Sequence, residues 1–170
     1  MPLTRFPDHE GRRVYLSTVL SFDLPAPDTS HSNHLSVAIL WMDRDSPSAR
    51  ELNLEVAIDL MEHGALGFVV GGTAAMEAGA LLERAVQEGE FVRSEEESIG
   101  IWVRPGASLE AVLWTASEEA MPPDAYADQP WDLVAWARAD DPIAKELRQA
   151  LPRLGEIVDR VYDEGGIEES

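Results

Sequence analysis

Short apolar runs alternate along this chain with longer segments whose apolar residues recur at helical spacing. The runs are too short for helices and are typical of strands buried on both faces; they lie at 35–42, 66–70, 99–103 and 131–137. The helical segments begin near Pro47, Ala74, Leu109 and Pro142. This alternation predicts a single α/β domain with a mostly parallel sheet of four or five strands and helices on both faces, a Rossmann-like three-layer sandwich.

Capping residues and prolines indicate where the helices begin and end. Ser46 and Ser108 stand where N-caps are expected, and Thr73 is a further candidate cap before the helix over 74–88. On that helix the pattern turns Met76 inward together with Leu82, Ala85 and Val86. Pro152 interrupts the last helical region, which predicts a kink or two consecutive helices.

The chain shows no internal linker and no repeat, so we expect one domain over 12–161. Residues 1–11 are predicted to be an N-terminal extension and 162–170 an acidic flexible tail. A fifth strand is expected within 14–22, where the residues have strand-like composition.

The charge limits the classes of partner. Thirteen basic and 32 acidic residues give a formal net charge of −19, and a field of that sign repels nucleic acid and anionic membranes while it attracts a basic protein. No apolar run reaches the ~20 residues that span a bilayer, and residues 1–7 lack the apolar stretch of a signal peptide, so a cytoplasmic location is expected.

Two scarce residue types limit the chemistry. The chain has no cysteine, which excludes disulfides, thiolate nucleophiles and sulfur-bound zinc. Its one lysine, Lys145, lies in a helical segment and serves neither a phosphate loop nor a Schiff base. The turn at 71–73, Gly-Gly-Thr, lacks the Gly-x-Gly-x-x-Gly spacing of dinucleotide-binding domains. No organic cofactor is expected.

The carboxyl ends of the strands carry the candidate catalytic residues. Ligands of parallel α/β sheets bind at these ends, and the polar residues there are Asp43, Asp45, Thr73, Asp140 and Asp141. This order is similar to that of magnesium-dependent phosphatases of the haloacid dehalogenase type. That resemblance implies an aspartate nucleophile with a second aspartate as proton shuttle, a hydroxyl on the phosphate, and Mg²⁺ on Asp43, Asp140 and Asp141.

The phosphatase chemistry also needs a cation near the phosphoryl group, and Arg104 is the candidate for that place. The alternative interpretation is structural. Asp45 or Ser46, and Asp141, stand at helix starts, where such side chains cap free N–H groups and offset the helix dipole.

Other polar and aromatic residues suggest binding rather than catalysis. His31 and His34 form a His-x-x-His pair in a Pro- and Ser-containing loop, without the spacing of a four-ligand zinc site. Trp114 lies one position beyond the apolar stripe of its helix and Trp131 stands at a strand entrance, so both are candidates for an interaction surface.

Two stretches carry a further resemblance: residues 64–72, GALGFVVGG, and residues 108–114, SLEAVLW, followed by Met-Pro-Pro at 121–123. They are similar to an uncharacterised family of small bacterial α/β domains, which implies the fold and no activity. The leading hypothesis is a non-catalytic, immunity- or regulator-like domain that binds a basic protein. The Mg²⁺-dependent phosphohydrolase is the alternative.

Overall fold

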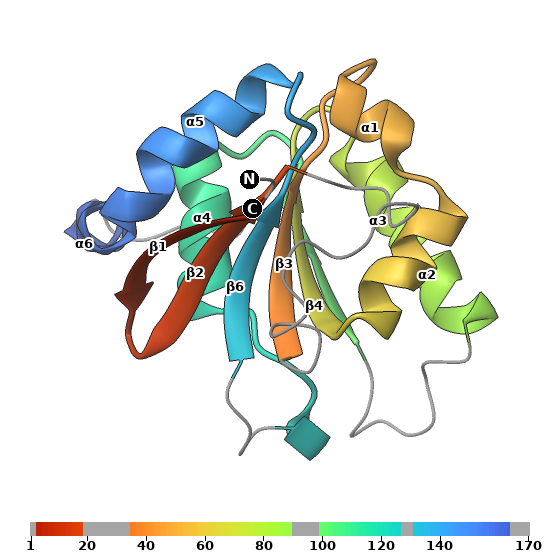
Figure 1. The fold of residues 1–170 in the computed structure, drawn as a ribbon, viewed down its shortest axis with the longest axis horizontal. Coiled ribbons are helices and arrows are strands. Elements are labelled where there is room, and N and C mark those ends of the chain that lie inside the picture. The colour runs from red at the N-terminus through yellow and green to blue at the C-terminus, as the bar shows by residue number, and fades with distance from the viewer. Residues whose placement is uncertain (1–2, 19–34, 90–98, 127–130, 164–170) are drawn as a thin grey trace.

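Six strands form one sheet in the order β1-β2-β6-β3-β4-β5 (Figure 1). The computed structural model describes residues 3–18, 35–89, 99–126 and 131–163. The strands are β1 Leu3–His9, β2 Arg12–Ser17, β3 Leu35–Trp41, β4 Ala65–Gly71, β5 Gly100–Val103 and β6 Trp131–Trp136. All neighbouring pairs are parallel except β1 with β2. The predicted α/β class is confirmed, with one strand more than the larger expected number.

Helices cover both faces of the sheet, as Figure 1 shows. One layer consists of α1 Pro47–Glu51, α2 Leu54–Glu62 and α3 Ala75–Glu88, and the other of α4 Leu109–Glu118, α5 Pro142–Ala150 and α6 Leu154–Asp163. Two short 3-10 helices, η3 Asp124–Tyr126 and η4 Leu151–Arg153, complete the described elements. Among the described helices, none has both the length and the apolar content to cross a bilayer.

The central strands are apolar on both faces because each face has its own core. On β3, Val37 and Ile39 pack with α4, α5 and α6, whereas Ala38 and Leu40 pack with α1, α2 and α3. Successive side chains of a strand point to opposite faces. Two covered faces therefore require the near-continuous apolar runs seen in the sequence.

Side-chain caps begin most of the helices. Ser46 Oγ accepts from Ala49 N–H, and Ser108 Oγ accepts from Ala111 N–H, as predicted. Asn53 adds an unforeseen cap, which divides the segment after Pro47 into α1 and α2. At Pro152 the chain makes η4 between α5 and α6, so the expected interruption yields two helices.

The structure corrects the expectation for the N-terminal residues. Instead of an extension outside the domain, Leu3–His9 forms the edge strand β1, which pairs with β2. Glu10 and Gly11, with φ of 52° and 79°, form the two-residue turn between them. At the other end α6 continues to Asp163, and 164–170 lie outside the described residues.

Two expectations for α3 are wrong. Met76 is 63% exposed rather than turned inward. Thr73 does not cap the helix: α3 begins after Ala74 without a side-chain cap, and Thr73 Oγ1 accepts from Arg44 N–H at 2.7 Å. The Thr73 hydroxyl, which the sequence pattern predicted as a helix cap, accepts instead from the Arg44 backbone in the neighbouring loop.

Gly72 provides a test of the turn between β4 and α3. Its φ is +97°, and a Cβ at this position would collide with the Met42 carbonyl, which already accepts from Ala74 N–H. We expect Gly72→Ala to lower the free energy of unfolding by about 2 to 5 kcal/mol, from backbone strain and overpacking together. Urea unfolding measures the loss.

Gly106 is the matched control. It also has a positive φ, +75°, but an added Cβ would meet nothing within 4 Å. Gly106→Ala should therefore lose only the strain, about 1 to 2 kcal/mol. Equal losses in the two variants would contradict the assignment of a close contact at Gly72.

Candidate functional site

Among the described strands, the place where a ligand crevice is expected lies between β3 and β6, where the strand order reverses. Neighbouring strands β3 and β6 are parallel, but β3 leads into α1 on one face while β6 leads into α5 on the other. Ligands of open α/β sheets bind where the connections diverge in this way, beyond the carboxyl ends of the two strands. The residues between α1 and α5 therefore decide whether this site is open.

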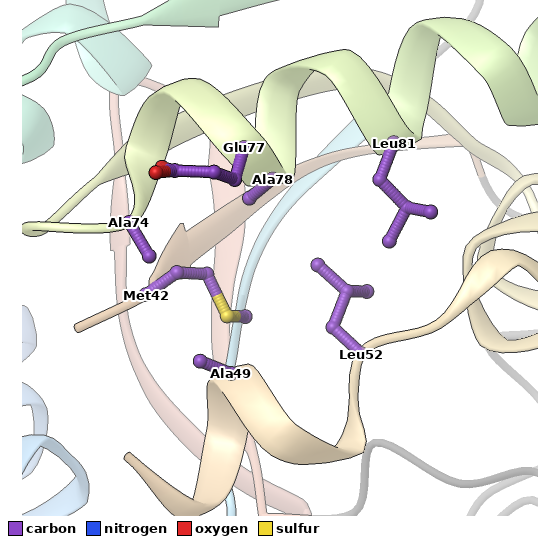
Figure 2. A pocket seen from close by; sticks show the side chains of 7 residues that line it. All are labelled: Met42, Ala49, Leu52, Ala74, Glu77, Ala78 and Leu81. Atoms are coloured by element: carbon purple, nitrogen blue, oxygen red, sulfur yellow. The ribbon is translucent and has the colours of Figure 1, made fainter. Parts of the chain in front are cut away.

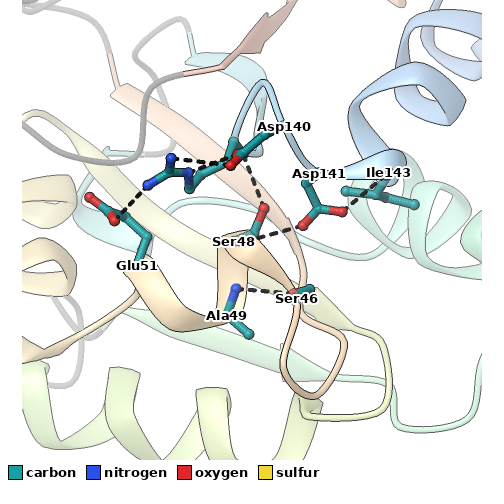
Figure 3. A network of polar contacts seen from close by, with 8 residues as sticks. Ser46, Ser48, Ala49, Glu51, Asp140, Asp141 and Ile143 are labelled. Atoms are coloured by element: carbon teal, nitrogen blue, oxygen red, sulfur yellow. Dashed lines mark hydrogen bonds and ion pairs between the residues drawn. The ribbon is translucent and has the colours of Figure 1, made fainter.

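The chain's own polar groups fill that place (Figure 3). Ser48 is fully buried, and its N–H donates to Asp141 Oδ2 at 3.2 Å. Asp141 is 6% exposed and also accepts from Ile143 N–H through Oδ1, at 3.1 Å. In turn Ser48 Oγ accepts from Arg138 N–H at 3.0 Å. One carboxylate thus caps α1 and α5 together, and the capping interpretation of Asp141 is confirmed.

Arg138 neutralises the acids at the rim of the same place. Its guanidinium donates to Glu51 at 3.0 Å and to Asp140 at 2.9 Å (Figure 3). These hydrogen bonds, first of all that to Asp140, raise the pKa of Arg138, and the same bond lowers the pKa of Asp140. Asp140 is therefore an exposed, paired carboxylate and not a free metal ligand.

Asp43 and Thr73 do come together, at the ends of β3 and β4. Asp43 Oδ1 accepts from Thr73 N–H at 3.0 Å, and Oδ2 accepts from Trp41 Nε1–H at 2.9 Å. Both carboxylate oxygens are held by donors of the protein. Asp45 is exposed with φ +63° and does not cap α1, since Ser46 takes that role.

The remaining parts of the predicted phosphatase site do not join this pair. Arg104 follows β5, where its N–H donates to Val70 O at 2.8 Å. Among the described residues, the acids Asp43, Asp140 and Asp141 form no group with ligand oxygens within 4.8 Å of one another. The structure therefore does not assemble the predicted set of Mg²⁺ ligands.

A shallow apolar groove lies between α1 and α3, on the face of the sheet that these helices cover. Its volume is about 130 Å³, and Leu52 and Leu81 point toward each other across it (Figure 2). It is lined by Met42, Ala49, Leu52, Ala74, Glu77, Ala78 and Leu81. Glu77 is the one charged lining residue, and its pKa is lowered by a hydrogen bond from its own backbone and by Arg44. Sequence patterns missed this groove because it depends on how α1 and α3 are spaced.

The two candidate interaction tryptophans are both half-buried. Trp114 packs on the core beneath α4, and its Nε1 is buried with no hydrogen-bond partner among the described residues. Trp131 lies under the guanidinium of Arg12, 4.8 Å from the ring centroid. The structure does not bring the two rings into one exposed patch. His31 and His34 lie outside the described residues.

The Trp131 ring belongs to a polar cluster at the amino-terminal edge of the parallel strands. His9, Glu10 and Arg12 of the β1–β2 hairpin meet Ser117 and Glu118 of α4 there. No sequence spacing signals this cluster, because more than 100 residues separate the hairpin from the end of α4.

These observations define the protein as a three-layer α/β domain. No protein-family model matches the chain, and comparisons with curated proteins and with solved structures find no similar chain. The resemblance to small bacterial α/β domains stays a prediction from its motifs.

Substitution of Asp141 tests the double cap. Asp141→Ala removes the N-cap of α5 and leaves the buried Ser48 N–H at the start of α1 without an acceptor. We expect the free energy of unfolding to fall by about 2 to 4 kcal/mol, measured by chemical denaturation. Asp140→Ala, the neighbouring exposed acid, is the control and should leave the unfolding midpoint nearly unchanged. Similar losses in both variants would refute the bridging role of Asp141.

Proposed function

We propose that this protein is a non-catalytic binding domain that recognises a basic protein segment through the groove between α1 and α3, as immunity or regulatory proteins do. The observation that carries the proposal is an apolar groove set in the more acidic of the two helical layers. A cytosolic location fits the proposal and is itself a prediction.

Charge is distributed unevenly between the helical layers. Helices α1, α2 and α3 hold seven carboxylates and two arginines, a net charge of −5; α4, α5 and α6 hold six carboxylates and three basic residues, a net charge of −3. Five carboxylates of the first layer are exposed: Glu55, Glu62, Glu77, Glu83 and Glu88. A basic segment would be steered to this layer and its association would weaken with added salt.

The groove supplies what charge alone does not, a place for an apolar anchor. Its volume of about 130 Å³ is close to that of cavities of about 150 Å³ that take up one benzene molecule. One leucine, methionine or aromatic side chain of the partner matches this size. Electrostatic attraction then sets the rate of encounter, and burial of the anchor sets the specificity.

The phosphohydrolase alternative has weaker support. Both oxygens of Asp43 accept hydrogen bonds, and Asp141 holds two helix starts. An aspartate nucleophile needs a free oxygen directed at phosphorus. Mg²⁺ has no role in the binding function proposed here.

Peptide binding tests the proposal. Short peptides rich in Lys and Arg, with either Leu or Ala at the centre, are compared by fluorescence anisotropy at low and high salt. We expect the Leu peptide to bind roughly tenfold or more tightly than the Ala peptide, because a buried leucine contributes about 1.5 to 3 kcal/mol. Both affinities should fall with salt, and an acidic peptide with Leu should not bind.

Two variants locate the anchor. Leu81→Ser, which alters the groove wall, should remove the preference for Leu over Ala while it preserves the salt dependence. Met121→Ser changes a methionine that is 55% exposed and does not line the groove, so the preference should stay. Equal affinity of the wild-type protein for the Leu and Ala peptides would rule out the groove as the binding site.

A further inference from the structure

A second candidate binding site lies at the amino-terminal ends of the parallel strands, whereas the groove and the double cap lie at the carboxyl ends. The last residue of β1, His9, and the turn residue Glu10 meet Glu118 at the end of α4. One ligand atom from each of the three side chains lies within 4.8 Å of the others. His9 and Glu10 lie in the β1–β2 hairpin and Glu118 lies at the end of α4, so the packing of the hairpin against α4 brings the three side chains together.

His9 is the fixed member of this group. Its side chain is 11% exposed, and Nε2 lies 2.6 Å from Ser117 Oγ and 3.8 Å from Glu10 Oε2. The ring nitrogen therefore faces the carboxylates, and the side chains of Glu10 and Glu118 are exposed. Small rotations of the two glutamates bring their oxygens to bonding distance of an ion held by the imidazole.

The same corner already holds a positive charge. Arg12 Nη2 donates to Ser117 O at 2.8 Å and to Glu10 Oε2 at 2.9 Å. Ser117 and Glu118 are the last residues of α4, and the carboxyl end of a helix attracts cations. This contact is a separate observation from the ligand distances, and it shows that the hairpin and the helix end stabilise a cation between them.

A metal ion can take over Glu10 without displacing Arg12. The Arg12–Glu10 pair is exposed on the glutamate side, and such pairs contribute little. After its loss, Arg12 keeps the Ser117 carbonyl and the Trp131 ring. The Ser117 hydroxyl would release Nε2 to the ion.

We propose that His9, Glu10 and Glu118 form a binding site for a divalent transition metal, with Zn²⁺ as the best match. An imidazole suits Zn²⁺ rather than Mg²⁺ or Ca²⁺, which prefer sets made of oxygens alone. Three protein ligands leave a coordination position for water or for a group of another molecule. The site does not depend on the groove or on the proposed peptide binding.

Zn²⁺ titration by calorimetry tests the proposal on the full chain. The protein carries His31→Gln and His34→Gln, which remove the His-x-x-His pair as a competing ligand set. We expect one equivalent of Zn²⁺ to bind, and the affinity to fall at least tenfold in His9→Gln and in Glu118→Gln. His63→Gln and Glu83→Gln, which change a histidine and an exposed carboxylate elsewhere, should bind as the parent does.

Two further measurements separate a site from the general attraction of an acidic surface. Co²⁺ should give visible absorption bands with the parent, and these should disappear in His9→Gln. Arg12→Gln removes the cation that competes for Glu10, so it should tighten Zn²⁺ binding. The control Arg84→Gln frees Glu88 on α3 in the same way and should tighten Zn²⁺ binding less. Circular dichroism confirms that each variant is folded.

The contrary results are equally specific. A titration that reaches about 100 μM Zn²⁺ without measurable heat would overturn the proposal, because structural zinc sites bind the ion far more tightly than that concentration requires. So would a Zn²⁺ affinity of His9→Gln or Glu118→Gln equal to that of the parent, or equal losses in the ligand and control variants.

Discussion

The hydrogen bonds of Asp141 connect the two helical layers beyond the carboxyl ends of β3 and β6. The carboxylate accepts from Ser48 N–H at the start of α1 and from Ile143 N–H at the start of α5, and Ser48 Oγ accepts from the backbone N–H of Arg138. Adjacent strands whose helices go to opposite faces leave amide groups of both helix starts buried at one place. A buried N–H without an acceptor is costly, so this part of the fold depends on one acid that reaches both helices.

That constraint also decides where function can lie. The crevice that open α/β sheets offer to ligands is occupied here by Ser48, Asp141 and Arg138. Of the acids that suggested a phosphatase, Asp43 and Asp141 hold backbone amides, and Asp140 pairs with Arg138. Within the part of the chain that the structure describes, the surfaces left available are the groove between α1 and α3 and the corner where the β1–β2 hairpin meets α4. One is apolar in an acidic layer, and the other combines an imidazole with carboxylates.

The hairpin has more influence than its position at the edge suggests. By pairing antiparallel to β2, β1 extends a parallel sheet and carries His9 to the end of α4. Arg12, at the start of β2, lies between the Trp131 ring and the Ser117 carbonyl, and so joins β2, β6 and α4. The tryptophan whose place at a strand entrance suggested partner binding instead packs against this arginine within the protein.

The sequence by itself determined the α/β class, the four apolar runs at β3, β4, β5 and β6, and the starts of α1, α4 and α5, because apolar strand runs and helix capping are local patterns. It did not determine the role of β1, the exposure of Met76 or the partners of Thr73.

The same holds for the sites: sequence pointed to Asp43, Asp140 and Asp141 as acids at strand ends, but only the fold decided that their oxygens face backbone amides and Arg138 rather than one another. The groove and the His9 cluster were invisible, since they join residues far apart in the chain. Contacts of that kind depend on the spacing and direction of packed elements, which no local pattern records.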